Sequence, residues 1–335
     1  MELKKRINDI LNYSEECAVL KNILLEVTNA CNNQCIFCAN QKMSRKIGSM
    51  NIVLAQNVLQ QAYDMGCRQV GLYATGESLL YPQLEKLIKI SKKIGYQYVY
   101  LTTNGLLLNL KRFIKLQQAG LDSIKISFNA VDRKSYELIH GLDGFDIVKE
   151  NLVSAFQYKK RNKLSIKVYV SYVSTKYTHN VEEIKTFFSD KCDEFVIIPV
   201  RNQCGYLPEI KYLIDETDDY WMSSQRKLPC RYVFDTACIT WEGYLTACCT
   251  DFQNYLVYAD LNQQLLIDAW HNQIIGRLRD EHSKKMLSNN LCAQCVLNQK
   301  NIEPLCEKYS TKQDISVINS NIMKRINELS LHTKK

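Results

Sequence analysis

The 335-residue sequence predicts an α/β protein with a parallel sheet, followed by a smaller cysteine-rich unit. Six short β-rich runs alternate with longer amphipathic stretches between residue 22 and about residue 200, which predicts a chain of β/α units. The runs are almost continuously apolar, as in strands that are buried on both faces. After residue 205 this alternation ends and closely spaced cysteines appear, which predicts the second unit.

The strand candidates follow one another in a regular order. Amphipathic stretches such as "NIVLAQNVLQQAYDMG" and "YPQLEKLIKISKKIG" separate them, and helices end at Gly66, Gly95 and Gly120, where a left-handed residue is expected. Six units in a row imply right-handed crossovers. A partial (β/α)6 barrel of TIM-like type fits best, and a doubly wound open sheet is the alternative, because periodicity does not separate the two. The candidate strands are 22–27, 69–74, 98–103, 123–128, 166–173 and 194–200.

The second unit is predicted to be a hairpin followed by a helix. The segment "YLPEIKYLIDETDDYWMSSQRKLP" resembles a linker with some helix, and "ACITWEGYLTACC" predicts a β-hairpin that turns at Glu242 and Gly243. The segment "LLIDAWHNQIIGRLRDEHS" predicts one helix. The expected organisation is an N-terminal extension, the barrel, the cysteine-rich unit with its linker, and a polar, helix-compatible tail, at residues 1–20, 21–205, 206–310 and 311–335.

The composition is that of an ordinary globular protein, with 46% hydrophobic and 23% charged residues. No stretch approaches the ~20 apolar residues of a membrane span, and the N-terminus lacks the apolar core of a secretion signal. We therefore expect a cytoplasmic protein with no membrane partner. The excess of 43 − 35 = 8 basic residues is spread over the chain, so no nucleic-acid partner is expected. Fourteen cysteines in a cytosolic protein favour metal binding over disulfides.

Cys31, Cys35 and Cys38 form a C-x3-C-x2-C array directly after the first strand, where β/α folds build their sites. Short thiolate spacings suit zinc or an iron–sulfur cluster. Structural zinc normally needs four ligands, and no fourth lies nearby. A [4Fe–4S] cluster held by three cysteines would keep one iron open to another molecule.

With an aromatic residue before its third cysteine, this loop resembles that of the radical S-adenosylmethionine (SAM) superfamily, and the similarity extends over residues 22 to 200. The resemblance implies that the open iron binds the amino and carboxylate groups of SAM. Cleavage of SAM then gives a 5′-deoxyadenosyl radical that abstracts hydrogen from a substrate. The implied external electron donor is a flavodoxin or ferredoxin.

Segments after the next three strands support the resemblance. "ATGESLL" is similar to the family's Gly-Gly-Glu-Pro segment, with Thr75 and Ser78 as departures, and it implies that Glu77 faces the SAM ammonium. "TTNG" and "SFNA" are similar to the family's Thr-Asn-Gly and Ser-Ile-Asp-Gly, although Asn129 replaces the acid. The cofactor-binding residues that the resemblance implies are Phe37, Thr75, Gly76, Glu77, Asn104, Ser127 and Asn129.

A second cysteine group resembles the auxiliary-cluster domain called SPASM or, when shortened, twitch. It contains a cysteine after proline, a Gly-x4-Cys on the hairpin and a distant C-x2-C. The resemblance implies one auxiliary [4Fe–4S] cluster, because only Cys306 follows, at the wrong distance for a second. Cys249 could replace Cys248 as the ligand, but the Gly-x4-Cys spacing counted from Gly243 ends at Cys248. A zinc ribbon is the alternative. The implied ligands are Cys230, Cys248, Cys292 and Cys295.

Two residues after the sixth strand are catalytic candidates. Cys204 could donate a hydrogen atom to a substrate radical, and Arg201 could hold an anionic or hydroxylated substrate. The simpler interpretations are a packed thiol and a surface arginine. The other cysteines are interpreted as small buried apolar residues: Cys17, Cys67, Cys192, Cys238 and Cys306.

The leading functional hypothesis is a radical SAM dehydrogenase of a sugar- or cyclitol-like metabolite, possibly nucleotide-linked, with the auxiliary cluster as electron acceptor. Small relatives with one auxiliary cluster include enzymes that oxidise a hydroxyl of an aminocyclitol to a ketone. One alternative is modification of a peptide or protein, by epimerisation or crosslinking. Another is a non-enzymatic protein that binds two structural zinc ions.

Overall fold

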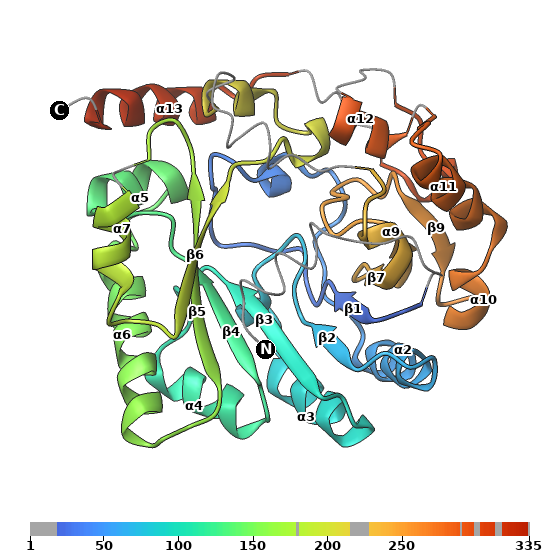
Figure 1. The fold of residues 1–335 in the computed structure, drawn as a ribbon, viewed down its shortest axis with the longest axis horizontal. Helices are drawn as coiled ribbons and strands as arrows, with labels where there is room; N and C mark the ends of the chain where they lie inside the picture. The colour runs from blue at the N-terminus through green and yellow to red at the C-terminus, as the bar shows by residue number, and fades with distance from the viewer. Residues whose placement is uncertain are drawn as a thin grey trace.

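The computed structural model describes residues 19–178, 181–214, 228–288, 290–297, 302–311 and 317–333. Most of the predicted N-terminal extension, Cys17 and a large part of the predicted linker lie outside these residues. The α/β fold and the parallel sheet of a partial barrel are confirmed, with the cysteine-rich region following it (Figure 1). No helix in the described ranges is both long and apolar enough to cross a membrane.

The strands belong to one sheet with the order β6-β5-β4-β3-β2-β1-β7-β8-β9. Strands β1 to β6 are parallel to their neighbours, as six consecutive β/α units require. Their bounds are β1 Asn22–Leu25, β2 Gln69–Gly71, β3 Tyr98–Thr103, β4 Ser123–Ser127, β5 Lys167–Ser174, β6 Glu194–Pro199, β7 Thr236–Ile239, β8 Tyr244–Thr246 and β9 Val257–Asp260.

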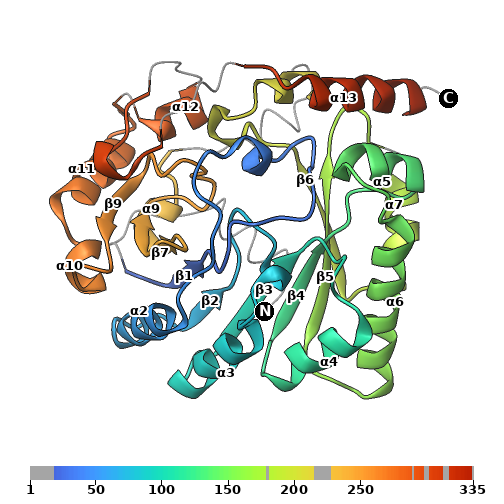
Figure 2. The same cartoon turned by 180° about the vertical axis from the view of Figure 1, so that it is seen from behind.

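The helices between the parallel strands lie along the outer side of the sheet (Figures 1 and 2). They are α2 Ile52–Asp64, α3 Leu84–Ile94, α4 Leu110–Gln118, α5 Arg133–His140, α6 Phe145–Arg161 and α7 Val181–Phe188. Gly66, Gly95 and Gly120 all have positive φ, which confirms the predicted helix ends. The later helices are α9 Tyr232–Asp235, α10 Leu266–Trp270, α11 Gln273–Ser283, α12 Leu291–Leu297 and α13 Ser320–Thr333.

Short 3-10 helices lie in the connections, several of them near the predicted site. They are η1 Ala39–Lys42, η2 Ser78–Leu80, η3 Gln203–Gly205, η4 Pro208–Tyr212 and η5 Glu307–Tyr309. The chain between β1 and α2 lies in the middle of the molecule in both views, between α12 on one side and α13 on the other (Figures 1 and 2).

The predicted hairpin is confirmed, and its place in the fold was not foreseen. Strands β7 and β8 are antiparallel, and Thr240 N donates to Tyr244 O across the turn. Strand β7 also pairs in parallel with β1, from Asn22 opposite Thr236 to Leu25 opposite Ile239. The cysteine-rich segment therefore continues the sheet of the barrel instead of forming a separate one. The predicted domain boundaries stay a prediction.

The single helix predicted after the hairpin is wrong, because the structure contains two. Asn272 lies between α10 and α11, and its side-chain oxygen accepts hydrogen bonds from Ile274 N (3.0 Å) and Ile275 N (3.1 Å). Helix α11 therefore has its own N-cap, a role for which asparagine is favoured. Strand β9 was also not predicted.

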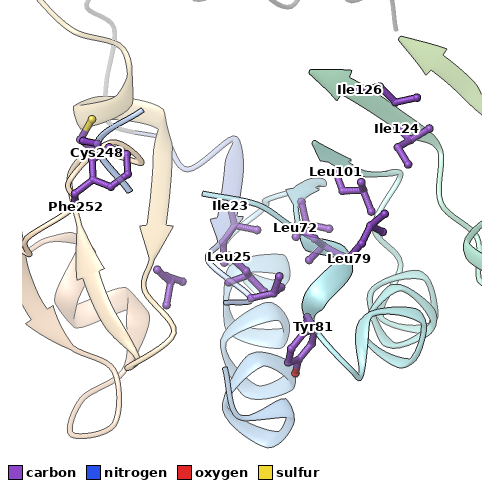
Figure 3. Packing of buried hydrophobic residues seen from close by; sticks show 14 of the residues in the cluster. Ile23, Leu25, Leu72, Leu79, Tyr81, Leu101, Ile124, Ile126, Cys248 and Phe252 are labelled. Atoms are coloured by element: carbon purple, nitrogen blue, oxygen red, sulfur yellow. The ribbon is translucent and has the colours of Figure 1, made fainter. Parts of the chain in front are cut away.

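The core lies between the sheet and the outer helices and continues toward the hairpin. Ile23 and Leu25 of β1 lie near Leu72 and Leu101, which come from the next two strands and their ends (Figure 3). Cys248 and the side chain of Phe252 belong to the same core on the hairpin side. The two cysteine-bearing regions therefore share one hydrophobic core.

Candidate functional site

The three-cysteine loop is fixed by the end of α5. Gln34 N donates to His140 O, and Ile36 N donates to Ile139 O, each at 2.9 Å. The loop begins after β1 and ends where Cys38 precedes η1. These backbone bonds place the three thiols at the carboxyl end of the sheet, as the sequence predicts.

The thiols of Cys31, Cys35 and Cys38 interact with one another. Burial is the main cause that raises the pKa of Cys31 to about 12, and the nearby Cys38 contributes to this increase. Burial also raises the pKa of Cys35 well above its usual value, with Cys38 and Cys31 adding to the effect. Three thiolates at close range in a poorly solvated loop need compensating positive charge. This donor set fits a thiolate-bound iron–sulfur cluster, although no ligand role is tested by the geometry alone.

Gly76 allows the loop after β2 to lie directly against the loop before the cysteines. A Cβ at this position would clash with Thr28 O and would lie 2.6 Å from Ala30 O. Glu77 N donates to Ala30 O at 2.8 Å, which fixes the approach. Only glycine fits here, because any side chain would separate the two loops.

The carboxylate of Glu77 accepts hydrogen bonds from three protein donors. Oε1 accepts from Thr103 Oγ1 (2.6 Å) and from Leu79 N (2.9 Å), and Oε2 accepts from Asn104 N (2.7 Å). Burial raises the pKa of Glu77, and these bonds oppose the increase. A carboxylate oxygen can accept two bonds, so Oε2 can accept a second donor. The contact of Glu77 with the SAM ammonium stays a prediction.

Asn104 links the end of β3 to the cysteine loop. Its Nδ2 donates to Asn32 Oδ1 at 2.6 Å, and a hydrogen bond from Asn104 lowers the pKa of Cys31. Thr75 is held at the same edge, since its hydroxyl donates to Glu26 and its carbonyl accepts from Asn40 Nδ2 at 2.8 Å. The sequence-predicted residues after β1, β2 and β3 are therefore brought together.

The residues predicted after β4 have mainly structural contacts. Ser127 Oγ lies 3.5 Å from Ser171 Oγ, and Asn129 Oδ1 accepts from Val173 N at 2.9 Å. Asn129 is buried in a left-handed conformation, with φ of 58°. Phe37 belongs to the main core. Contacts of these residues with SAM stay predictions.

A second group of thiols lies where η3, the hairpin and α12 meet. Hydrogen bonds with Cys248 and Cys295, followed by burial, raise the pKa of Cys204 well above its usual value. Thr250 Oγ1 lies 3.1 Å from both Cys204 Sγ and Cys248 Sγ. The sequence offers Cys204 as a packed thiol or, less simply, as a hydrogen-atom donor, and both roles stay predictions. The structure places it beside two of the predicted auxiliary ligands.

The turn that carries Cys204 is closely packed against α12. Gln203 and Cys204 have φ of 50° and 55°, and Asn202 Nδ2 donates to Cys295 O at 2.8 Å. A Cβ at Gly205 would clash with the side chain of Gln294. Non-glycine residues rarely adopt this backbone conformation, so tertiary packing holds the thiol in place.

The other cysteines of this region lie around the same group. Cys230 N donates to His282 Nδ1 at 3.2 Å, and the pKa of His282 is lowered to about 4 by burial, against an opposing effect of Cys248. Asn290 Oδ1 accepts from Cys292 N at 2.9 Å. Cys249 forms thiol hydrogen bonds with Cys238 and Cys248. The position of Arg201, just after β6, does not test its proposed substrate role.

A buried ion network joins the segment after η1 to the hairpin, and no sequence pattern predicts it. Arg45 Nη2 lies 2.5 Å from Glu26 Oε2 and 2.5 Å from Glu242 Oε2. Ser44 N donates to Gln253 Oε1 at 3.2 Å. Since Glu242 and Gln253 come from the cysteine-rich region, these contacts hold it against the three-cysteine loop.

Comparison with known proteins identifies two families along the chain. Residues 25–187 match the radical SAM superfamily, and residues 230–296 match SPASM, an iron–sulfur cluster-binding domain. A probable GTP 3′,8-cyclase of Saccharolobus islandicus (strain M.14.25 / Kamchatka #1) is 34% identical over 139 residues, 41% of this chain and 44% of the relative. The GTP 3′,8-cyclase of Chlorobaculum tepidum is 30% identical over 131 residues, 39% of each chain. The chain thus spans less than half the length of these curated relatives.

Solved structures share the fold at low identity. BtrN in complex with AdoMet and 2-DOIA has a TM-score of 0.53 and 19% identity, over 78% of this chain and 87% of BtrN. Streptococcus suis SuiB bound to the precursor peptide SuiA has a TM-score of 0.62 and 17% identity, over 79% and 68% of the two chains. Native anSMEcpe with bound AdoMet has a TM-score of 0.60 and 14% identity, over 93% and 99%.

Proposed function

This chain belongs to the radical SAM superfamily and carries a SPASM iron–sulfur domain, and from this premise we propose that it dehydrogenates a carbohydrate-like metabolite. The substrate class that we propose is a sugar or cyclitol, possibly nucleotide-linked. The electron donor that we propose is a flavodoxin or ferredoxin, and the compartment is the cytoplasm.

The proposed cofactor site is formed by the loops after the first four strands. Cys31, Cys35 and Cys38 hold a [4Fe–4S] cluster, which, with SAM bound, supplies a 5′-deoxyadenosyl radical. Glu77 receives the SAM ammonium at Oε2, which accepts a hydrogen bond from Asn104 N and has room for a second donor. Asn104 orients the cysteine loop through Asn32. Ser127 and Asn129 are proposed to lie near the ribose.

The observation that carries the proposal is the buried second group of thiols next to the first loop. The hydrogen-bonded contact of Cys204 with Cys248 and Cys295 supports a thiolate-rich centre there. Contacts of Arg45 with Glu242, and of Ser44 with Gln253, hold this region against the three-cysteine loop. We propose that one auxiliary [4Fe–4S] cluster is bound by Cys230, Cys248, Cys292 and Cys295.

The proposed reaction converts a secondary alcohol into a ketone. One hydrogen atom leaves the carbinol carbon, the hydroxyl proton goes to a base, and the remaining electron passes to the auxiliary cluster. The net change in the substrate is the loss of two electrons and two protons, and an oxidised auxiliary cluster is the acceptor. Arg201, just after β6, is the residue that we propose for binding the substrate hydroxyls or an anionic group.

The test uses protein reconstituted without oxygen, SAM, dithionite and sugars or cyclitols deuterated at carbinol carbons. The expected result is deuterium in 5′-deoxyadenosine and a ketone product in equal amounts. Turnover of many substrate molecules per reducing equivalent is expected, since oxidation returns an electron. Stoichiometric consumption of reductant, with deuterium transfer, would contradict dehydrogenation.

Two other substrate classes are tested in the same assay. SuiB, which has a similar fold, is solved with a precursor peptide, so unmodified peptides form one arm. The partial relatives are GTP 3′,8-cyclases, so GTP forms the other. If a peptide were modified or GTP were cyclised, and no deuterium were transferred from any sugar, the substrate would be the peptide or GTP and the proposed sugar or cyclitol would be wrong.

Metal analysis tests the non-enzymatic alternative. The proposal predicts iron and acid-labile sulfide in equal amounts, with about eight of each per chain for two [4Fe–4S] clusters. The alternative predicts two zinc ions per chain and no visible absorption. Zinc in protein that was purified and reconstituted without oxygen would overturn the proposal.

A further inference from the structure

The N-terminus of the C-terminal helix α13 is anchored to η1, the short helix that follows the cysteine loop. Lys42, the last residue of η1, donates to Val317 O at 2.7 Å and lies 3.0 Å from Glu209 Oε1. The same Glu209 accepts a hydrogen bond from Asn319 N, and Asn319 caps the first turn of α13 by accepting from Ile322 N at 3.2 Å. Glu209 is fully buried, whereas the bond of Lys42 to Val317 O is exposed, so the buried part of this connection is the carboxylate of Glu209.

The body of α13 packs against α5, the helix whose end fixes the cysteine loop. Ile322, Ile326 and Leu329 form its buried face. His332 Nε2 lies 3.2 Å from Asp132 Oδ1 at the start of α5. Figures 1 and 2 show the two helices side by side above the sheet. The tail that had no predicted role therefore packs against the helix that fixes the cysteine loop.

Arg325 points from α13 toward the cysteine loop. A Cβ at Gly141 would lie 2.6 Å from Arg325 Nη1 and 3.1 Å from Gln34 Cβ, so the guanidinium, Gly141 and Gln34 meet closely. Burial raises the pKa of Cys35 well above its usual value, and the charge of Arg325 opposes that increase. Burial lowers the pKa of His140 to about 4, and the charge of Arg325 adds to that decrease. Nη1 of Arg325 is buried and has no hydrogen-bond partner among the described residues.

We propose that Arg325 raises the reduction potential of the cluster held by Cys31, Cys35 and Cys38, and that α13 is therefore an electrostatic part of the radical-generating site. This inference rests on the proposed ligand role of these cysteines. Addition of one electron from a low-potential donor makes the cluster more negative by one charge, with no bond formed or broken. A guanidinium at a poorly solvated site would stabilise that extra charge.

The experiment is a redox titration of the full-length reconstituted protein with dithionite, followed by electron paramagnetic resonance. The signal that changes on addition of SAM identifies the cluster of the three-cysteine loop. Arg325→Gln removes the charge, Arg325→Lys keeps it, and Lys324→Gln removes the charge of an exposed neighbour on the same helix.

We expect Arg325→Gln to lower the midpoint potential, so that the ratio of reduced to oxidised cluster at a fixed potential falls about tenfold, or about 59 mV for one electron. Arg325→Lys should restore most of the difference, Lys324→Gln should show none, and SAM affinity should be retained in all three.

Several results would overturn the inference. An unchanged potential with weaker SAM binding in Arg325→Gln would assign Arg325 to the cofactor carboxylate. If Arg325→Lys and Arg325→Gln had equal midpoint potentials, the shape of the arginine side chain and not its charge would control the potential. If Arg325→Gln lost iron, Arg325 would be needed for the structure of the cysteine loop. Absence of a SAM-sensitive signal in the unsubstituted protein would instead contradict the proposed function.

Discussion

For Cys204, the structure shows contacts that the sequence does not predict. Its position after the sixth strand is compatible with a packed thiol or a hydrogen-atom donor, and the structure adds that its thiol contacts Cys248 and Cys295. The region therefore contains more thiols than one cluster needs. The resemblance to SPASM implies Cys230 as the fourth ligand, and on that proposal Cys204 is a hydrogen-bonding neighbour of the ligands.

We predict that Cys230→Ala and Cys248→Ala each lose about four iron atoms per chain, because a [4Fe–4S] cluster missing one thiolate is poorly retained. Cys204→Ala should keep its iron and change only the spectrum of the auxiliary cluster. Iron analysis with Cys67→Ala, a buried cysteine elsewhere in the core, provides the control. If Cys204→Ala lost iron and Cys230→Ala retained it, Cys204 would be the ligand and Cys230 the hydrogen-bonding neighbour.

Glu77→Gln tests the residue that joins the second and third strand ends. The amide cannot accept bonds at both terminal atoms, and it carries no charge for the SAM ammonium. A charge-assisted bond contributes ~1.5–3 kcal/mol, so SAM should bind at least about tenfold more weakly at unchanged iron content. Equilibrium dialysis measures this, with Glu85→Gln on α3 as control. If Glu77→Gln bound SAM as tightly as the unsubstituted protein, Glu77 would not contact SAM.

At the scale of elements, asparagine caps divide the chain more finely than its hydrophobic pattern suggests. The apolar residues of 265–283 fit one helix, yet the side chain of Asn272 starts a new helix there. The backbone of Asn272 is extended, with φ of −68° and ψ of 163°. Helix α10 therefore does not continue into α11. Local capping thus competes successfully with periodicity at this position.

We predict that Asn272→Ala lowers the free energy of unfolding by about 1 kcal/mol, because two backbone donors of α11 lose their acceptor. Urea unfolding measured by circular dichroism detects the change. Gln273→Ala, on the exposed first residue of α11, should change the free energy by less than about 0.5 kcal/mol. A fully stable Asn272→Ala protein would show that tertiary packing alone separates α10 from α11.

At the scale of the whole molecule, the two cysteine regions belong to one continuous sheet. Strand β7 lies next to β1, so the hairpin is at the side of the strand that leads into the cysteine loop. Arg45 then connects Glu26, just after β1, with Glu242 in the hairpin turn. The barrel and the SPASM region are therefore expected to unfold together.

We predict that Arg45→Met lowers the free energy of unfolding by about 3–5 kcal/mol, because the buried Glu26 loses its cation. Release of the hairpin should also reduce electron transfer to the auxiliary cluster. Arg133→Met is the matched control, since the ion pairs of Arg133 with Asp143 and Asp146 are exposed and should contribute at most about 1 kcal/mol. Equal losses in the two variants, measured by urea unfolding, would contradict the structural role of Arg45.

The sequence alone determined the fold class, the approximate positions of the six parallel strands, the hairpin and the three-cysteine loop. These features depend on local patterns, since apolar runs, helix-ending glycines and short cysteine spacings act within about twenty residues. Tertiary structure alone decided that β7 continues the sheet, that Cys204 meets Cys248 and Cys295, and that Arg325 of α13 approaches Cys35. Such contacts join residues tens to hundreds of positions apart, and only the packing of the complete core selects them.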